Sequence, residues 1–250
     1  MDLGLIGRRA AVSAGTSGLG LAIATALAAE GAVVTICGRN AERARSAAES
    51  IGASWVVCDL DEPAAGARFV EAASSRMGGV DILVANTSGP PAGALADFDA
   101  DAYRAAFDRC AVPVIDMCRA AVPGMRMRTW GRIIVVTSVA VRTPMPGLAL
   151  SMVARSGLTA YLTALSDDVA NEGVTVNSLQ PGLHATARVA QVYEGDKLET
   201  QLRGIPAGRM GKPEDFGSIA AFLASDRAGY VTGTTIAVDG GLSRRTAFGE

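Results

Sequence analysis

The chain has 250 residues, of which 49% are hydrophobic and only 5% aromatic, so it can bury a sizeable core built mainly from Ala, Val, Leu and Ile. Its formal net charge is −2 and its Lys and Arg residues do not cluster, which argues against nucleic acids and anionic membrane surfaces as partners. Four cysteines without CxxC spacing and a single histidine offer no plausible metal site, and they indicate free thiols in a reducing compartment.

Short apolar runs alternate with longer Ala-rich helical patterns along the chain. The expected strands are Ala10–Ser13, Val33–Cys37, Trp55–Cys58, Ile82–Ala85, Ile133–Thr137, Val174–Leu179 and Thr235–Val238. The clearest expected helices between them are Leu19–Glu30, Ala41–Ser50, Ala64–Met77 and Arg104–Met125. Repeated strand–helix–strand order with right-handed crossovers predicts one α/β domain over residues 1–250, a Rossmann fold with a doubly wound, seven-stranded parallel sheet and helices on both faces.

One long segment, residues 183–211, shows no clear periodicity and contains Gly195, Gly204, Pro206 and Gly208. A loop of that length in a compact domain is usually functional or mobile, so we interpret it as a flap over a substrate. No run reaches the roughly 18 apolar residues of a membrane span, and the N-terminus lacks a signal-peptide pattern. We therefore expect a cytoplasmic protein without membrane partners.

A glycine-rich turn follows the first expected strand directly. It reads Ser13-Ala14-Gly15-Thr16-Ser17-Gly18-Leu19-Gly20 and leads into a helix. Glycines there let the backbone approach a pyrophosphate, whose charge meets the free amides at the start of the helix. Because strand, turn and helix occur in the required order, the turn predicts a dinucleotide site.

The end of the second strand indicates which dinucleotide binds. In this fold an acidic residue about 20 residues beyond the turn grips the ribose 2′-hydroxyl of NAD. Here the strand ends in Cys37-Gly38-Arg39-Asn40, where Arg39 is placed to meet a 2′-phosphate. We therefore favour NADP(H) over NAD(H), although a solvated helix-start arginine is the simpler alternative. Asp59, after the third strand, is a candidate acceptor for the adenine amino group, or a plain loop aspartate.

Together these residues resemble the short-chain dehydrogenase/reductase family, particularly its 3-oxoacyl-acyl-carrier-protein reductase-like branch. The likeness covers essentially the whole chain. Its segments are Ser13–Gly20, Cys58-Asp59-Leu60, Ala85-Asn86-Thr87-Ser88, Ser138, Asn177-Ser178-Leu179-Gln180-Pro181-Gly182, Thr186 and Val238-Asp239-Gly240-Gly241.

The resemblance implies a set of cofactor-binding positions and an oligomer. Ser13-Ala14 stands where the family has Thr-Gly, a change of one methyl at the second position that should preserve binding. Thr186 and the backbone near His184 would hold the nicotinamide carboxamide. The implied cofactor-binding residues are Ala14, Thr16, Ser17, Gly18, Leu19, Gly20, Arg39, Asp59, Leu60, Asn86, Arg155, Pro181, His184 and Thr186. The family usually forms tetramers, so we expect an even-numbered homo-oligomer through the helix around Ser151–Val169 and the strand Thr235–Val238.

The catalytic pattern departs from the family. There a Ser is followed by Tyr-x-x-x-Lys, and an Asn lies on the preceding long helix. Ser138 matches, but thirteen positions later the chain reads Ser151-Met152-Val153-Ala154-Arg155, and the Asn position falls on Cys110.

This departure matters because carbonyl reduction needs a hydride and a proton. A tyrosine phenol whose pKa is lowered by a nearby ammonium supplies that proton near neutral pH. The hydroxyl of Ser151 is a much weaker acid, and its side chain lacks the aromatic ring and is therefore shorter. Arg155 stays charged and can bind ribose hydroxyls or an anionic group, but it does not pass protons easily. His184, titrating in the right range, and Tyr193 in the flap are alternative proton donors; the simpler alternative for His184 is that only its backbone matters.

Three functions remain open on these grounds. The first is an NADP(H)-dependent oxidoreductase that reduces a small or carrier-bound carbonyl or imine through Ser138, Ser151 and Arg155. The second is a non-redox enzyme, such as a cyclase or dehydratase, in the same pocket. The third is a catalytically inactive subunit that binds cofactor or an active partner. We favour the first, although the fold by itself does not establish activity.

Overall fold

The computed structural model describes residues 1–192 and 196–244. Within them, seven parallel strands form one sheet in the order β3-β2-β1-β4-β5-β6-β7. The strands are β1 (Arg9–Val12), β2 (Val33–Gly38), β3 (Ser54–Val57), β4 (Ile82–Ala85), β5 (Gly131–Val136), β6 (Val174–Pro181) and β7 (Thr235–Val238). The predicted fold, a single Rossmann-type sheet with helices on both faces, is confirmed.

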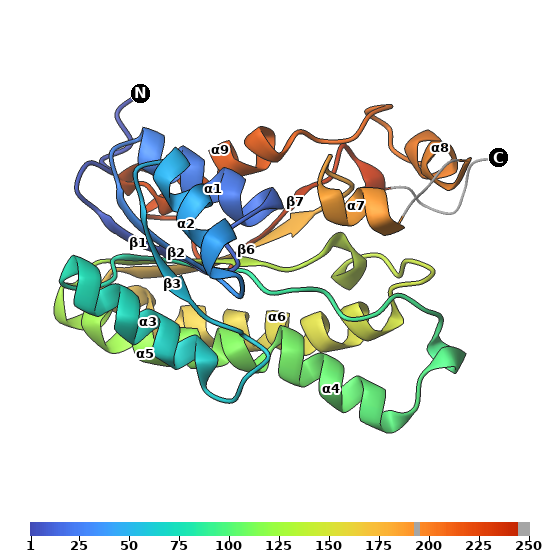
Figure 1. Cartoon of the computed structure of the whole chain (residues 1–250), viewed down its shortest axis with the longest axis horizontal. Coiled ribbons are helices and arrows are strands. Elements are labelled where there is room, and N and C mark those ends of the chain that lie inside the picture. Colours follow the sequence, from blue (N-terminus) through green and yellow to red (C-terminus); the bar gives the residue numbers. More distant parts are fainter. Residues whose placement is uncertain (193–195, 245–250) are drawn as a thin grey trace.

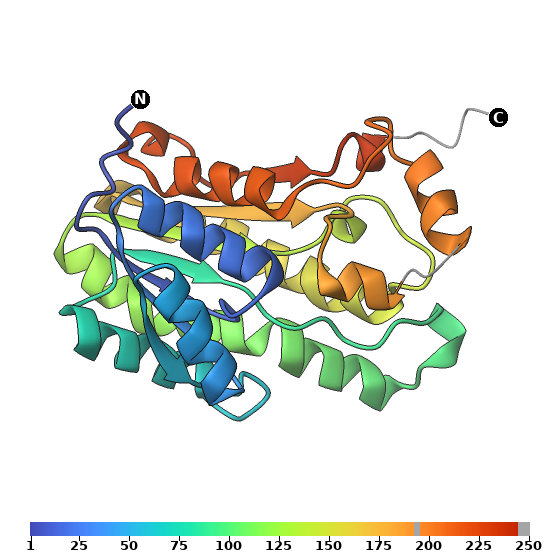
Figure 2. The ribbon, with the colours of Figure 1, turned by 45° about the horizontal axis from the view of Figure 1, so that its top comes forward.

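Helices cover the two faces of the sheet (Figures 1 and 2). They are α1 (Gly18–Ala29), α2 (Ala41–Ser50), α3 (Ala65–Met77), α4 (Ala100–Cys110), α5 (Val112–Met127), α6 (Ala149–Val169), α7 (Ala187–Val192), α8 (Asp196–Arg203) and α9 (Pro213–Ala224), with single 3₁₀ turns η1 (Leu95–Asp97), η2 (Val139–Val141), η3 (Ala170–Glu172), η4 (Asp226–Ala228) and η5 (Leu242–Arg244). One core lies under α3, α5 and α6, and a second lies under α1 and α9. Both are aliphatic, as the composition predicted, with Phe69 and Phe216 the largest buried side chains.

The sequence order of the strands places a crevice in the sheet. β1 pairs in parallel with β2 on one side and with β4 on the other, so the order in which successive strands are added to the sheet reverses between β1 and β4. Loops leaving the carboxyl ends of these two strands diverge to opposite faces, which leaves an opening where ligands bind in such sheets. The glycine turn follows β1 and therefore lies at this opening.

The predicted helix Arg104–Met125 is wrong as a single element. The structure has α4 and α5 instead, separated at Ala111, which ends one helix and caps the next. Pro113 lies in the first turn of α5, where its missing N–H costs nothing, but it cannot continue a helix that begins at Ala100. The break fixes Cys110 as the last residue of α4, with its side chain buried.

The segment 183–211 contains more regular structure than its sequence indicated. The structure places α7 and α8 there, two helices of 6 and 8 residues. Helices this short give too few turns for an apolar period to emerge, which is why the pattern went undetected. Tyr193, the alternative proton donor, lies outside the described residues.

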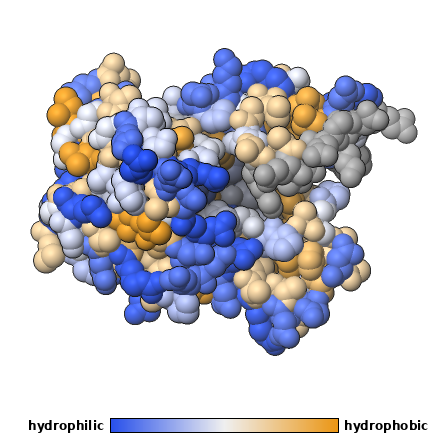
Figure 3. Space-filling view, viewed as in Figure 1, coloured by the Kyte–Doolittle hydropathy of each residue, from blue (hydrophilic) through white to orange (hydrophobic). Residues whose placement is uncertain are grey.

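The surface seen in Figure 3 is largely hydrophilic over α2 and α3, with a small hydrophobic patch over β3. β3 is an edge strand of the sheet, and its Val57 is 51% exposed. None of the helices in the described ranges combines the length and apolar character that crossing a membrane requires.

Candidate functional site

A cavity of about 610 Å³ opens at the carboxyl ends of β1, β2, β4, β5 and β6. It brings together nearly all the residues predicted for cofactor binding and catalysis. Those that line it are Ala14, Thr16, Ser17, Gly18, Leu19, Arg39, Asp59, Leu60, Asn86, Ser138, Ser151, Arg155, Pro181, His184 and Thr186. Gly20 does not line the cavity; a Cβ at this position would lie 2.2 Å from the carbonyl oxygen of Ala14, so its role is close packing of the helix against the turn.

The glycine turn fits a pyrophosphate. Gly18 has φ +54°, a conformation that favours glycine. Ser17 is the N-cap of α1, yet its side chain makes no capping hydrogen bond, so the first amides of the helix stay available. Free amides and the positive end of the helix dipole bind an anion at this position. The residues present therefore fit the phosphates of a dinucleotide.

Ser13 ties this turn to the next strand of the crevice. Its hydroxyl donates to the carbonyl of Asn86 at 2.7 Å and accepts from the amide of Asn86 at 2.8 Å. These two bonds hold the end of β1 against the end of β4. Asn86 thereby reaches the cavity wall from a fixed backbone.

Ala14 adopts a left-handed conformation, with φ +46°. A residue with a Cβ pays about 1–2 kcal/mol for that conformation, which glycine avoids. We expect Ala14→Gly to raise the free energy of unfolding by up to about 1 kcal/mol. Glycine relieves the strain of the left-handed conformation, and this gain should exceed the loss that comes from the greater conformational entropy of glycine in the unfolded chain. Urea unfolding checks this result. A destabilised variant would show that the methyl packs favourably enough to offset the strain.

The end of the cavity near β2 and α2, where the sequence predicts the adenosine of the cofactor, carries two arginines. Arg39 and Arg43 both line it, both are exposed, and neither makes an ion pair within the described residues. The sequence pointed to Arg39 and missed Arg43. The sequence feature that could have revealed Arg43 is Asn40, a typical N-cap residue. Its side chain accepts a hydrogen bond from the amide of Arg43 at 2.8 Å, so α2 begins there and its first turn faces the cavity.

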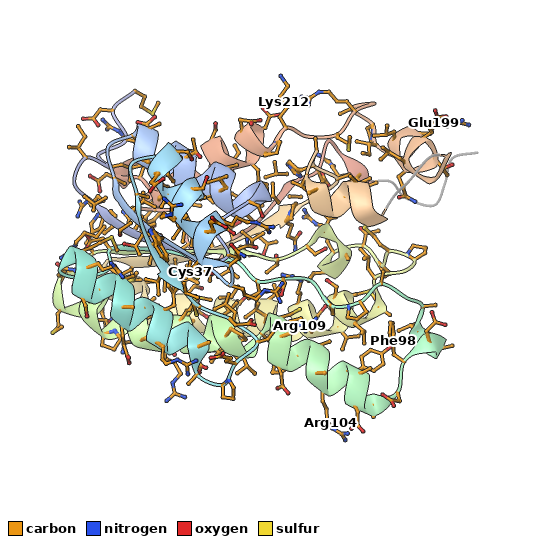
Figure 4. The ribbon with its side chains drawn as sticks, viewed as in Figure 1. Cys37, Phe98, Arg104, Arg109, Glu199 and Lys212 are labelled. Carbon is orange, nitrogen blue, oxygen red and sulfur yellow. The ribbon has the colours of Figure 1, made fainter. Side chains whose placement is uncertain are left out.

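Two thiols lie near this end, Cys37 and Cys58. Figure 4 shows Cys37 inside the fold at the sheet, and both residues line the cavity. A hydrogen bond to Cys58, together with burial, raises the pKa of Cys37. Asp59 follows Cys58, and one of its carboxylate oxygens accepts the amide of Asp61 at 3.1 Å, which leaves the other for a ligand. Across the described ranges, no group of three His, Cys, Asp or Glu residues is arranged to hold a metal ion.

The opposite end of the cavity holds the three predicted catalytic residues. Ser138 follows β5 and caps η2, accepting the amide of Ala140 at 3.2 Å. Ser151 lies in the first turn of α6, and Arg155 lies one turn later on the same face. The Nε of Arg155 donates to the Oγ of Ser151 at 3.2 Å, so the two act as one polar unit at the cavity wall.

Arg155 is deeply buried, at 6% exposure, and a second hydrogen bond fixes it. Its Nη1 donates to the carbonyl of Val136 at 3.0 Å. Burial lowers the pKa of Arg155, while the neighbouring Cys110 opposes that shift. A guanidinium remains charged at neutral pH even so. Cys110 is buried beside it, and burial raises the pKa of its thiol, so it stays neutral and fills space rather than supplying charge.

His184 also lines the cavity, and its side chain is enclosed by the surrounding residues. Its ring packs edge-on against Phe216 at 5.2 Å between centroids, and its Nδ1 lies 3.3 Å from the carbonyl of Gly182. It is only 2% exposed, and burial lowers its pKa, so the ring is neutral near pH 7. These contacts favour the simpler alternative, in which only the backbone at His184 serves a ligand. Thr186, two residues on, accepts the amide of Val189 with its hydroxyl at 3.4 Å and lies over Gly18.

Comparison with known proteins agrees with this geometry. The family model described as enoyl-(acyl carrier protein) reductase matches residues 13–243, nearly the whole of the chain. The chain belongs to the short-chain dehydrogenase/reductase family. Dehydrogenase/reductase SDR family member 4 of Oryctolagus cuniculus is 34% identical over 249 residues, which covers 96% of this chain and 95% of that relative.

Two further members of the family show how wide the likeness is. The 3-oxoacyl-[acyl-carrier-protein] reductase FabG of Haemophilus influenzae is 31% identical over 238 residues, 94% of this chain and 98% of that protein. The structure of L-sorbose reductase from Gluconobacter frateurii, solved with NADPH and L-sorbose, superposes with a TM-score of 0.91 at 28% identity, covering 98% of this chain and 100% of that one. These relatives support a short-chain reductase.

Proposed function

We propose that this short-chain dehydrogenase/reductase is an NADP(H)-dependent reductase of a carbonyl compound, with Ser151 and Arg155 in place of the family's tyrosine and lysine. The observation that carries the proposal is a single cavity that joins the glycine turn and Arg39 to Ser138, Ser151 and Arg155. Cofactor and substrate positions are therefore continuous, as hydride transfer requires.

NADP(H) is supported by charge at the adenosine end. Among the described residues that line this end, Arg39 and Arg43 are cationic and Asp59 is anionic. Arg39 follows β2, where an acidic residue would select the 2′-hydroxyl of NAD. Two unpaired guanidinium groups instead favour the doubly charged 2′-phosphate, to which arginine makes strong, often bidentate hydrogen bonds.

We expect NADPH to bind about 10- to 100-fold more tightly than NADH, because charge-assisted hydrogen bonds to one phosphate are each worth about 1.5–3 kcal/mol. Arg39→Ala should largely remove the preference, and Arg39→Ala with Arg43→Ala should abolish it. Quenching of Trp fluorescence during titration gives both dissociation constants. Arg45→Ala is the matched control, since Arg45 lies on α2 and pairs with Glu49. Equal affinities of the unmodified protein for the two cofactors would contradict the assignment.

The polar residues at the other end bind the substrate oxygen. When bound, the nicotinamide supplies the hydride. The Oγ of Ser138 accepts one amide, so its hydrogen is free to donate to a carbonyl oxygen. Ser151 likewise accepts from Arg155, which leaves its own hydrogen for the same oxygen. Two hydroxyl donors backed by a buried cation stabilise the negative charge that develops on this oxygen.

Among the described residues, the three proposed catalytic side chains, Ser138, Ser151 and Arg155, include no acid that ionises near neutral pH. Ser151 therefore passes a proton in from water rather than acting as the acid of the reaction. A preformed protonated imine would avoid this need, but the buried charge of Arg155 repels a cationic substrate. That repulsion favours a carbonyl over a simple iminium.

A turnover assay tests the proposed function. NADPH oxidation is followed at saturating cofactor over a panel of ketones, oxo acids and cyclic imines, and oxidation with carbonyl substrates is the expected result. Oxidation with imines only would reject the carbonyl assignment. Tight NADPH binding with no turnover on the panel, together with copurification of an active homologue, would instead support an inactive cofactor-binding subunit.

We also expect an even-numbered homo-oligomer. α4 packs against α6, and Phe107 and Val153 on these helices are 40% and 48% exposed. Small-residue helix faces with exposed apolar side chains suit close two-fold packing. Light scattering coupled to size exclusion should give an even multiple of the 25.5 kDa chain mass. A monodisperse species of 25.5 kDa would refute this expectation.

A further inference from the structure

Two arginines in the described chain are almost fully buried, Arg132 and Arg155. Arg132 is well satisfied. Its guanidinium donates to the carbonyls of Ser225, Gly131 and Gly173 at 3.1, 2.9 and 3.3 Å, and it stacks 4.4 Å from the ring of Trp130. Arg132 thus shows how this fold accommodates a buried guanidinium when no ligand is involved.

Arg155 makes two hydrogen bonds instead of three, and within the described residues no aromatic ring stacks on it. A guanidinium has five N–H donors, and the two hydrogen bonds of Arg155 go to Ser151 and Val136. The other three N–H groups have no partner among the described residues, and no carboxylate there forms an ion pair with Arg155. The arginine next to Cys110 differs in this respect: Arg109, labelled in Figure 4, pairs with Asp61 at 2.9 Å.

The unpaired charge faces the cavity. Arg155 lines its wall together with Ser138 and Ser151. Thr87, after the neighbouring strand β4, lines the same cavity, is 7% exposed, and has no partner for its buried Oγ1. Buried hydroxyls and charges are normally hydrogen-bonded, so the unpaired Oγ1 of Thr87 and the cavity-lining guanidinium of Arg155 fit a polar ligand in this cavity.

We propose that the substrate is an oxo acid, whose carboxylate pairs with the free N–H groups of Arg155 while its carbonyl oxygen meets Ser138 and Ser151. This inference rests on the proposed reductase function. A carboxylate matches a guanidinium fork in shape and charge, and it neutralises the buried cation. The ribose hydroxyls of a bound cofactor are neutral and would leave the charge of Arg155 uncompensated. The cofactor phosphates belong at the glycine turn, at the start of α1.

The first part of the test uses the unmodified protein and measures binding. Protein saturated with NADP⁺ is titrated calorimetrically with 2-oxobutanoate and with acetoacetate, and in parallel with the methyl ester of each acid. We expect each acid to bind about 10- to 100-fold more tightly than its ester, as for charge-assisted hydrogen bonds. Equal affinities of acid and ester would overturn the inference, whatever the turnover assay gives.

The second part assigns the preference to its residue. Arg155→Met removes the charge at similar length and should bring the ratio of acid to ester affinity to about one, with both affinities measured on the variant after its saturation with NADP⁺ has been checked. Arg155→Lys keeps the charge and should retain part of it. Arg109→Met is the control, since that guanidinium is already paired, and it should keep the full preference. An acid preference that survives in Arg155→Met would overturn the inference.

Inorganic phosphate and acetate are titrated against the same complex. Binding as tight as that of the oxo acids would show a general anion site and reject the oxo-acid class.

The binding readout keeps this inference separate from the proposed function. NADPH oxidation with neutral ketones, without a preference for acids in binding, would support the reductase function and reject the oxo acid as the substrate class. Selective acid binding without NADPH oxidation would remove the reductase function and with it the role of the acid as substrate.

Discussion

Replacing Ser151 by tyrosine and Arg155 by lysine together is expected to raise the reduction of simple neutral ketones by about 10²–10⁴-fold. The double change restores a phenol whose acidity an adjacent ammonium increases, at the spacing of one helical turn on α6. Ser151→Tyr by itself should gain less. The guanidinium of Arg155 is held by the carbonyl of Val136 and by Ser151, and its five fixed donors leave less freedom to reorient around a ring.

The measurement is NADPH oxidation by the unmodified protein, both single variants and the double variant on one ketone panel. NADPH affinity and melting temperature are recorded for each variant, so that a loss of folding or of cofactor binding is recognised. A double variant that folds and binds NADPH yet turns over ketones no faster than the unmodified protein would show that the substrate space has been refilled, with Met152 or Cys110 as the candidates.

Ser138→Ala is expected to lower kcat about 10²–10³-fold on the best substrate of the unmodified protein, with the dissociation constant of NADPH unchanged. Removing one donor to a developing oxyanion typically has an effect of this size. The hydroxyl also caps η2 by accepting the amide of Ala140, so some loss of stability, about 1 kcal/mol, accompanies the change.

Ser225→Ala separates the two effects. Ser225 caps the 3₁₀ turn η4 with the same geometry, accepting the amide of Arg227 at 3.2 Å, and it does not line the cavity. This variant should lose stability without losing kcat. If Ser138→Ala and Ser225→Ala lower kcat equally, Ser138 acts through the fold and not on the substrate oxygen.

Much of the fold was predictable because its signals are local. Strands such as Ile82–Ala85 and Thr235–Val238 are short apolar runs bounded by turn residues, and the structure gives them the predicted bounds. The alternation of strands and helices then leaves few topologies with right-handed crossovers. The division of the long helix at Ala111 was missed because the apolar period continues through it, although Pro113 marked the place.

The candidate site was predictable where its residues lie in one local turn, and less predictable where residues from distant elements come together. The glycine turn and Arg39 follow directly from strand ends. Arg43 reaches the cavity only because Asn40 starts α2 where it does, and the unpaired state of Arg155 depends on what three separate strands and helices place around it. Asn40 is a local signal for the start of α2, but which way that turn faces and what surrounds Arg155 depend on tertiary contacts, which spacing and composition do not record.

Transfer of deuterium from C4-deuterated NADPH tests the central claim most directly. The unmodified protein is incubated with the deuterated cofactor and the panel of ketones, oxo acids and imines, and the products are examined by mass spectrometry. The account predicts a reduced product that carries one deuterium at the former carbonyl carbon, formed from an oxo acid and formed about 10²–10³-fold more slowly by Ser138→Ala. Tight binding of the cofactor without deuterium in any product would contradict the reductase assignment.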